Sequence, residues 1–492
     1  MASNKIISKS KFISGLQCKR LLWVAVNDNN RLGEPNPATQ RIFEQGHDVG
    51  RLAQQLFPGG LALTEDFSAN LKQTREALSL RRPLFEAGFL AGRLFCRVDV
   101  LCPGAGDEWD IVEVKSSTEV KKENLHDVSF QRHVCRLAGL EIGRVKIMHI
   151  NNQYVRRGGL DLNELFITED VTDSLDEYTA GIGEEIADML ACIDSDTCPD
   201  GLIGRGCDQP YTCSLKPECW AVLPAQHVFT LNYGGKLAED LLSLGITDIR
   251  DIPPDVRLSQ KQHIQRDCAL CGQPHLDPDG VRAFLDTLEY PLYFLDFETF
   301  QAAVPPYEGS WPYQQIPFQY SLHVLRGPGQ GPEHYHYLHG NREDPRPPLL
   351  AELGRVIGRT GSVLVYFQGF EEGRLKEAAE IFPEHQGWID NVRARMVDLY
   401  APFRGFLYYH PSQRGSASLK QVMPALTGIG YDQLEINEGG LASLKYLEMV
   451  ADGLSEDERL DIRRNLLTYC AQDTGGMIAM LERLRQLADN QA

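Results

Sequence analysis

The chain has 492 residues, of which 42% are hydrophobic and 24% are charged, a composition typical of a folded globular protein. At roughly 100 to 200 residues per domain, this length predicts two to four domains rather than a single core. Lys and Arg number 49 against 68 for Asp and Glu, so the formal net charge is −19. The protein as a whole therefore does not attract a polyanion such as nucleic acid. A polyanion has to be bound by local positively charged patches or by metal ions.

Targeting signals and cysteine content give expectations about the compartment. The longest apolar stretch, Leu21 to Val26, is far below the roughly 18 residues that cross a bilayer, so we expect no membrane span. No apolar segment follows the N-terminal lysines, and we therefore expect no signal peptide and a cytoplasmic location. In a reducing compartment, the 12 cysteines are expected to be core thiols or metal ligands rather than disulfides.

The first pattern with chemical meaning is a hairpin predicted over residues 92–117. Alternation places Glu113 and Lys115 on one face of its second strand, and Asp99 lies on the first strand. Two carboxylates can hold Mg²⁺, and a lysine can orient a water molecule or stabilise developing charge. This arrangement is typical of phosphodiester cleavage, and the alternative is a surface hairpin with a Glu–Lys ion pair.

A cysteine-rich loop follows an amphipathic helix predicted over 182–193. Cys207, Cys213 and Cys219 are spaced six residues apart in a segment broken by Gly and Pro, where thiolates can converge on a metal. We expect the first domain to end just beyond this loop. Residues 226–288 show short helical patterns interrupted by Gly and Pro, and they are expected to form a helical connector.

The third pattern begins in a strongly apolar strand predicted over 290–300. Its alternation puts Asp296 and Glu298 on one face, and burying this pair without a cation is unfavourable. A second strand runs into a helix that carries Glu371, and a helical pattern near the C-terminus places Tyr469 and Asp473 four residues apart on one face. The alternative is an acidic loop with a tyrosine and an aspartate on a helix surface.

The Gly- and Ser-rich segment 415–420 ends in a lysine. Ser416, Ser418 and Lys420 are of a type that contacts a phosphate backbone, and a plain flexible loop is an equally valid interpretation.

The order of residues around the first hairpin resembles that of RecB-like nucleases of the PD-(D/E)XK superfamily, including members that carry an iron–sulfur cluster. The resemblance implies a catalytic core of Asp99, Glu113 and Lys115. Glu86 matches an upstream acidic position, and Gln131 matches the glutamine of the following helix.

In the resembled nucleases, one cysteine near the start of the domain and three near its end hold a [4Fe–4S] cluster. The resemblance implies that role for Cys18, Cys207, Cys213 and Cys219, with Cys198 as the alternative for one of these ligands. Zinc binds the same thiolates and stays open as the alternative. The upstream metal-binding histidine has only His47 as a shifted candidate, and Cys135 stands where the family usually has a tyrosine.

The third pattern resembles the tyrosine-bearing DEDD exonucleases of the ribonuclease H-like fold. In that family, carboxylates bind two divalent ions, Mg²⁺ or Mn²⁺. The resemblance implies that Asp296, Glu298 and Asp473 are metal ligands and that Tyr469 orients the attacking water. Glu371 stands where the family usually has an aspartate, with Asp398 as an auxiliary candidate.

Together, the two halves resemble a bacterial family of unknown function that joins both kinds of module. The resemblance implies an α/β protein with a restriction-endonuclease-like domain over 1–225, a helical connector over 226–288 and a ribonuclease H-like domain over 289–492. The expected function is a metal-dependent nuclease with a 3′–5′ exonuclease centre and a RecB-like centre, with DNA favoured over RNA as its partner. An RNA-processing exonuclease, or a nucleic-acid-binding scaffold with one inactive centre, are the alternatives.

Overall fold

The structure, a computed structural model, describes residues 5–489 and shows a mixed α/β protein. The chain forms two compact units, the first comprising residues up to 222 together with 302–313, and the second comprising 223–301 together with the residues from 314 onward. The segment predicted as a connector is therefore part of the second unit, and a short excursion after residue 301 belongs to the first. Within the described residues, no helix is both long enough and apolar enough to span a membrane.

The first unit is built on a seven-stranded sheet with the order β2-β3-β4-β5-β6-β7, and β1 pairs with β4. Its strands are β1 (Ile7–Ser8), β2 (Leu61–Ala62), β3 (Leu84–Ala91), β4 (Leu94–Pro103), β5 (Trp109–Lys115), β6 (Ile142–Ile150) and β7 (Phe166–Asp170). The antiparallel pairing of β4 with β5 confirms the predicted hairpin. β5 and β6 are parallel, and a helix connects them.

Helices of the first unit position its chemistry against this sheet. They are α1 (Lys9–Gln17), α2 (Lys19–Asn27), α3 (Pro37–Gln54), α4 (Phe67–Ala77), α5 (Lys122–Leu137), α6 (Leu162–Leu165), α7 (Asp176–Thr179), α8 (Ile182–Asp194) and α9 (Lys216–Trp220). The predicted helix 182–193 is thus confirmed by α8. The buried rings of Phe12 and Phe130 stack with centroids 4.8 Å apart, which holds the start of the chain against α5.

A five-stranded sheet with the order β11-β10-β9-β12-β13 lies at the centre of the second unit. Its strands are β9 (Leu292–Phe300), β10 (Ile316–Leu325), β11 (Glu333–Leu338), β12 (Val363–Val365) and β13 (Met396–Asp398), and β8 (His275–Leu276) pairs separately with β14 (Tyr408–Tyr409). β10 is antiparallel to both β9 and β11, whereas β12 is parallel to both β9 and β13. The buried strand predicted over 290–300 is confirmed by β9.

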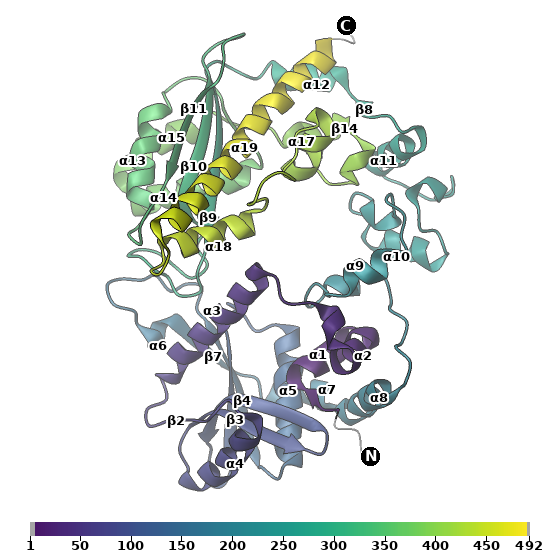
Figure 1. Cartoon of the computed structure of the whole chain (residues 1–492), viewed down its shortest axis with the longest axis vertical. Helices are drawn as coiled ribbons and strands as arrows, with labels where there is room; N and C mark the ends of the chain where they lie inside the picture. Colours follow the sequence, from purple (N-terminus) through teal and green to yellow (C-terminus); the bar gives the residue numbers. More distant parts are fainter. Residues whose placement is uncertain (1–4, 490–492) are drawn as a thin grey trace. The chain divides into compact units, whose positions relative to one another are not determined.

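Helices flank this second sheet. They are α10 (Gly235–Ser243), α11 (Gln260–Cys271), α12 (Pro278–Leu285), α13 (Arg346–Val356), α14 (Gln368–Ile381), α15 (Gln386–Arg393), α16 (Ala401–Arg404), α17 (Leu419–Thr427), α18 (Gly439–Val450) and α19 (Glu456–Asp489). The 34-residue helix α19 runs along β9 and β10 (Figure 1). It therefore brings the C-terminal tyrosine and aspartate to the strand that carries Asp296.

Candidate metal centres

Strand β9 and helix α19 bring acidic side chains together in the second unit. One carboxylate oxygen each of Asp296 and Glu298 and the sulfur of Cys470 all lie within 4.8 Å of one another. The Cys470 Sγ atom is 3.5 Å from Asp296 Oδ2. Cys470 is buried, as expected of a core thiol, but its contact with Asp296 was not predicted from the sequence.

Two further carboxylates complete this centre, which we call the second-unit centre: Asp296, Glu298, Glu371 and Asp473. Burial raises the pKa of Glu298, and the charges of Asp296, Asp473 and Glu371 raise it further. Burial likewise raises the pKa of Glu371, with Asp296 as the next cause. The charge of Asp473 also raises the pKa of Asp296, so the four groups predicted from sequence are linked in one electrostatic site.

The register of the sheet explains how α19 is held over these carboxylates. Ser321 of β10 pairs with Asp296, and its hydroxyl lies 2.7 Å from the Thr474 hydroxyl of α19. Gln319 pairs with Glu298, and its Nε2 donates to the carbonyl of Leu466 at 2.9 Å. The strand next to β9 therefore anchors α19 directly opposite the two acidic positions.

The second-unit centre has little compensating positive charge. Burial raises the pKa of Asp473 to about 7, although a hydrogen bond from Tyr431 and the charge of Lys420 oppose the rise. The Lys420 Nζ atom donates to the carbonyl of Asn437 at 2.6 Å. Glu371 Oε2 is buried and has no hydrogen-bond partner among the described residues. Arg374 also acts on Glu371, but its guanidinium is ion-paired with Glu377. Four carboxyls beside one lysine, with an unpartnered acceptor, suit a site that binds cations.

Two tyrosines line the same centre. The Tyr431 hydroxyl donates to Asp473 Oδ1, and its ring centroid is 6.1 Å from that of Tyr469. Burial and the charge of Asp473 raise the pKa of both phenols, so both remain hydrogen-bond donors at neutral pH. Sequence analysis identified Tyr469 from its helical spacing but missed Tyr431, which lies in a loop without periodicity.

Asp398 has a structural role at the edge of this centre. Its Oδ1 accepts hydrogen bonds from the backbone N–H groups of Phe367 and Tyr400, each at 3.0 Å. These bonds fix the start of α14, whose first turn carries Glu371. The predicted auxiliary ligand therefore positions the backbone near Glu371.

In the first unit, Glu113 is the hub of a second cluster, and it is 1% exposed. The Lys115 Nζ atom is 2.7 Å from Glu113 Oε1 and 2.6 Å from Asp127 Oδ2. Gln131 Nε2 donates to Glu113 Oε2 at 2.7 Å and to Asp127 Oδ1 at 3.0 Å. The hairpin and α5 thus bring the predicted Glu, Lys and Gln together, and they add Asp127, which sequence analysis missed.

Asp99 and Lys9 complete what we call the first-unit centre. The pairing of Val100 with Val112 places Asp99 opposite Glu113, and Asp99 Oδ2 accepts from the N–H of Val114 at 2.8 Å. The Lys9 Nζ atom, at the start of α1, is 2.7 Å from Glu113 Oε1 and 3.7 Å from Asp99 Oδ1.

The balance of these charges determines whether Glu113 is protonated or ionised. Burial and the charge of Asp99 act to raise the pKa of Glu113, but Lys115 and Lys9 outweigh them and hold it below its ordinary value. Glu113 is therefore ionised, and two ammonium groups compensate its charge.

Of the two remaining candidates in the first unit, Glu86 lies beside the first-unit centre, whereas His47 belongs to no group of metal-binding side chains among the described residues. Glu86 has a left-handed backbone with φ of 60°, and it lies opposite Asp99 between the paired positions of β3 and β4. Burial, followed by the charge of Asp99, raises the pKa of Glu86 to about 7. His47 is exposed on α3, and no three-ligand group that includes it occurs among residues 5–489.

The predicted cysteine ligands pack in one cluster between α2 and the loop that precedes α9. Its cysteines are Cys18, Cys198, Cys207, Cys213 and Cys219. Burial raises the pKa of the Cys213 thiol, and the neighbouring thiols of Cys18, Cys207 and Cys219 add to this rise. Two arginines reinforce the junction, because Arg20 and Arg31 each donate to Glu218 Oε1 at 2.6 Å.

The spacing of these thiols bears on the metal they suit. With Zn–S bonds of 2.3 Å, tetrahedral zinc requires sulfurs about 3.8 Å apart. Among the described residues, no three cysteine sulfurs lie within 4.8 Å of one another. No three of the clustered thiols therefore stand at the spacing of a formed tetrahedral zinc site.

Comparison with known proteins gives one family match. The family described as "Domain of unknown function (DUF2779)" matches residues 293–418, a segment that includes Asp296, Glu298 and Glu371. No curated protein matches the chain. A solved structure titled "Crystal structure of SSO0001" is 12% identical, covers 46% of this chain and 90% of that chain, and has a TM-score of 0.24, too low to indicate a shared fold.

Proposed function

We propose that the second-unit centre hydrolyses phosphodiester bonds of nucleic acid with the help of divalent metal ions, as a 3′–5′ exonuclease of the ribonuclease H-like fold. The observation that carries this proposal is the convergence of four carboxyls beside a single lysine. Their raised pKa values mean that ionising all four without cations is unfavourable. Mg²⁺ and Mn²⁺ prefer such oxygen ligands.

Each side chain has a distinct part in this proposal. Asp296, Glu298, Glu371 and Asp473 would hold two ions, which supply activation of the attacking water and stabilisation of the leaving 3′-oxygen. The neutral phenol of Tyr469 orients that water by donating a hydrogen bond. The Lys420 ammonium, which lies 5.3 Å from the Tyr469 ring centroid, attracts the phosphate. Burial and the charge of Asp296 raise the pKa of Cys470, so its thiol stays protonated beside the oxygen ligands.

We propose a RecB-like nuclease centre of the PD-(D/E)XK type in the first unit. Asp99 and Glu113 supply carboxylates for one divalent ion, and Lys115 orients water or stabilises developing charge. Lys9 favours a second possibility for this centre, because its ammonium already compensates Glu113 at 2.7 Å. In that case the first unit binds nucleic acid as a scaffold, and hydrolysis takes place only in the second.

The cysteine cluster supports a bound [4Fe–4S] group, with zinc as the alternative. Cys18 lies between α1 and α2, Cys207 and Cys213 precede α9, and Cys219 lies in α9 near the end of the first unit. A group held by all four thiolates would join these two segments and stabilise the unit. The resemblance to iron–sulfur RecB-like nucleases favours the cluster over zinc.

DNA is the favoured substrate because of the resemblance to RecB-like nucleases, and RNA is the alternative. The test is hydrolysis of end-labelled DNA and RNA, single- and double-stranded, with Mg²⁺ or Mn²⁺ and with EDTA. We expect Asp296→Asn to abolish stepwise shortening from the 3′ end, whereas Lys115→Met affects only the first-unit centre. Glu384→Gln, at an exposed position of the second unit, is the matched control. Undiminished cleavage by both site variants contradicts the proposal.

A further inference from the structure

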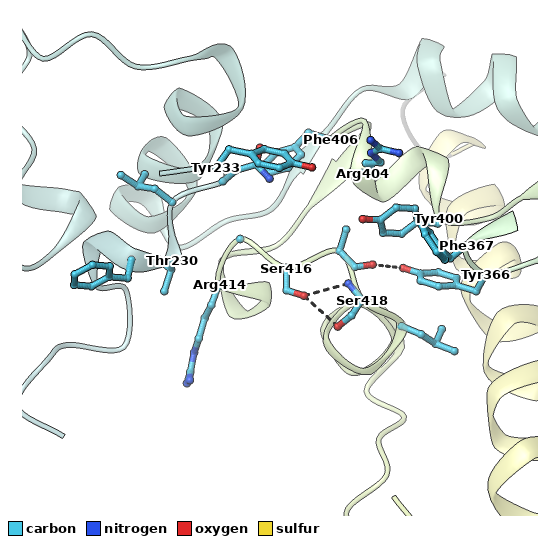
Figure 2. A pocket seen from close by; sticks show the side chains of 16 residues that line it. Thr230, Tyr233, Tyr366, Phe367, Tyr400, Arg404, Phe406, Arg414, Ser416 and Ser418 are labelled. Carbon is cyan, nitrogen blue, oxygen red and sulfur yellow. Dashed lines mark hydrogen bonds between the residues drawn. The ribbon is translucent and has the colours of Figure 1, made fainter. Parts of the chain in front are cut away.

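The second unit contains a cavity of about 660 Å³ lined by aromatic and cationic side chains (Figure 2). Its walls come from the segment 229–233, from the start of α14, and from two segments around Arg404 and Ser416. Its volume is in the range of ligand pockets. Carboxylate side chains are absent from this lining among the described residues, so the cavity differs in charge from the neighbouring acidic centre.

Large aromatic surfaces face solvent in this cavity. Tyr233 is 85% exposed and Phe367 is 54% exposed. The Phe367 ring meets the Tyr400 ring edge to face, with centroids 5.8 Å apart. Because every nucleobase presents a flat π-surface, exposed rings of this kind form stacking platforms for unpaired bases.

The backbone around the cavity is strained. Of the seven described non-glycine residues with positive φ, four line this cavity: Tyr233, Phe367, Phe406 and Arg414, with φ between 48° and 75°. Bulky side chains rarely adopt this conformation, and such residues concentrate at functional sites. The hydrogen bond from Phe367 N–H to Asp398 at 3.0 Å holds the backbone at one of these positions.

Two arginines supply positive charge. Arg404 and Arg414 are exposed, and neither makes an ion pair with any residue of the described chain. The Arg404 guanidinium lies 6.0 Å from the Tyr400 ring centroid. An unpaired guanidinium beside an aromatic ring suits a nucleotide, whose phosphate it can bind while the ring stacks on the base.

Two chain segments lead from the wall of the cavity to residues of the second-unit centre. Phe367 directly precedes α14, which carries Glu371 in its first turn. Leu419 lines the cavity, and the next residue, Lys420, places its ammonium 5.5 Å from the Tyr431 ring centroid. The Tyr366 hydroxyl donates to the carbonyl of Ala417 at 2.5 Å and joins these two walls.

We propose that this cavity binds a single-stranded segment of the nucleic-acid substrate, with bases stacked on Tyr233 and Phe367 and phosphates bound by Arg404 and Arg414. This inference rests on the proposed function, and it specifies an unpaired strand as the substrate. The bound segment leads towards the carboxylates of the second-unit centre. A duplex does not expose its base faces, so the cavity selects strands whose ends are unpaired.

The test is equilibrium binding of fluorescein-labelled oligothymidylate and oligouridylate to the full-length protein, followed by fluorescence anisotropy, with Ca²⁺ in place of Mg²⁺. We expect Tyr233→Ala to weaken binding roughly tenfold, since stacking on one ring is lost. Its ring is exposed, so little packing is removed. Leu244→Ala, at another exposed apolar position of the second unit, is the control.

Salt dependence tests the phosphate contacts. The slope of log Kobs against log salt concentration is negative, and each phosphate contact to a single strand contributes about 0.7 to its magnitude. In the double variant Arg404→Ala with Arg414→Ala, two contacts are lost, so the slope should become shallower by about 1.4. Arg359→Ala, at an exposed position outside the cavity, should leave the slope unchanged. The two oligonucleotides distinguish DNA from RNA as the source of the strand.

Unchanged affinity in both sets of variants overturns the inference, even if Asp296-dependent hydrolysis is present. Equal affinity for blunt duplex and single strands also overturns it. If the native protein neither binds nor cleaves any of the strands, the proposed function fails together with the inference. Weaker binding in the cavity variants, with normal binding in Leu244→Ala and Arg359→Ala, supports it.

Discussion

At the residue scale, Lys9 determines the charge balance of the first-unit centre. Its ammonium is within 4 Å of three carboxylates, those of Asp99, Glu113 and Asp127. Burial acts to lower the pKa of Lys9, but these neighbours raise it well above its ordinary value, so the side chain remains charged. A divalent ion at the same carboxylates has to compete with this ammonium.

Lys9→Met is therefore expected to strengthen Mn²⁺ binding at the first-unit centre, by roughly tenfold or more. Calorimetric titration in an Asp296→Asn background measures this centre without the second. Lys11→Met, on the same helix, is the matched control because Lys11 bonds to the carbonyl of Ile6 rather than to the carboxylates. Weaker or unchanged Mn²⁺ affinity in Lys9→Met would show that Lys9 does not compete with the ion.

Sequence patterns located some of these residues and missed others for physical reasons. Alternation in a strand and four-residue spacing in a helix placed Glu113, Lys115, Tyr469 and Asp473, because these periods fix which side chains share a face. Lys9 approaches Glu113 only through tertiary packing of α1 on α5, and no local period encodes that contact. Asp127 could be predicted from helical spacing, because it lies four residues before Gln131 on α5 and therefore on the same face of that helix.

At the element scale, α19 aligns the second-unit centre through buried hydrogen bonds. The Thr474 hydroxyl lies 2.7 Å from Ser321 Oγ and 2.8 Å from His323 Nδ1. Burial, together with the neighbouring His334, lowers the pKa of His323 to about 4, so this ring is neutral at pH 7. The network holds α19 in one register on β10, and hence holds Asp473 against β9.

Removing the Thr474 hydroxyl should loosen this alignment. Thr474→Val keeps the shape of the side chain but removes the hydroxyl that partners His323 Nδ1, and it leaves Ser321 with His334 Nε2 at 2.9 Å as its remaining side-chain partner. We expect a cost of about 1–3 kcal/mol in the free energy of unfolding. Urea denaturation measures this loss, and we expect kcat for hydrolysis to fall as well. Thr468→Val, on an exposed face of the same helix, should change neither quantity. Equal changes in unfolding free energy and kcat for Thr474→Val and Thr468→Val would show that the hydrogen bonds of Thr474 do not align α19.

The cysteine cluster joins two distant segments of the first unit. With the proposed iron–sulfur group, Cys213→Ser should reduce the iron content and the broad visible absorption of anaerobically purified protein, and it should lower the thermal stability, because one proposed ligand is lost. Cys102→Ser, at a cysteine outside the cluster, should retain the iron content, the visible absorption and the thermal stability. Stoichiometric zinc without iron in the native protein would replace the iron–sulfur assignment by its alternative.

At the scale of the whole molecule, strands and helices were easier to predict than the units they form. The hairpin β4–β5, the strand β9 and the helix α19 follow from hydrophobic periodicity. The boundary between units was harder, because residues 302–313 leave the second sheet and pack with the first unit. Contacts of this kind depend on side chains far apart in sequence, so composition alone does not reveal them.

The raised pKa of Asp473 makes the stability of the metal-free protein depend on pH. The folded-state pKa of about 7 exceeds the unfolded value of about 3.9, so the folded protein binds the extra proton between pH 4 and 7. Stability from this group is therefore present at low pH and is lost as the pH rises through 7. We expect the native protein to lose at least roughly 1 kcal/mol relative to Asp473→Asn between pH 5 and 8.

Thermal unfolding with EDTA measures this difference, and Mn²⁺ should abolish it because bound ions stabilise the ionised carboxylates. A difference between native protein and Asp473→Asn that stays constant from pH 5 to 8 would contradict the raised pKa.

The central claim is that Asp296, Glu298, Glu371 and Asp473 together bind divalent metal ions. The most direct measurement is electron paramagnetic resonance during Mn²⁺ titration of metal-free full-length protein, in parallel with Asp296→Asn and the exposed control Glu384→Gln. We predict that the native protein and the control bind a pair of Mn²⁺ ions that Asp296→Asn does not bind. Identical Mn²⁺ stoichiometry and affinity in all three proteins would contradict the account.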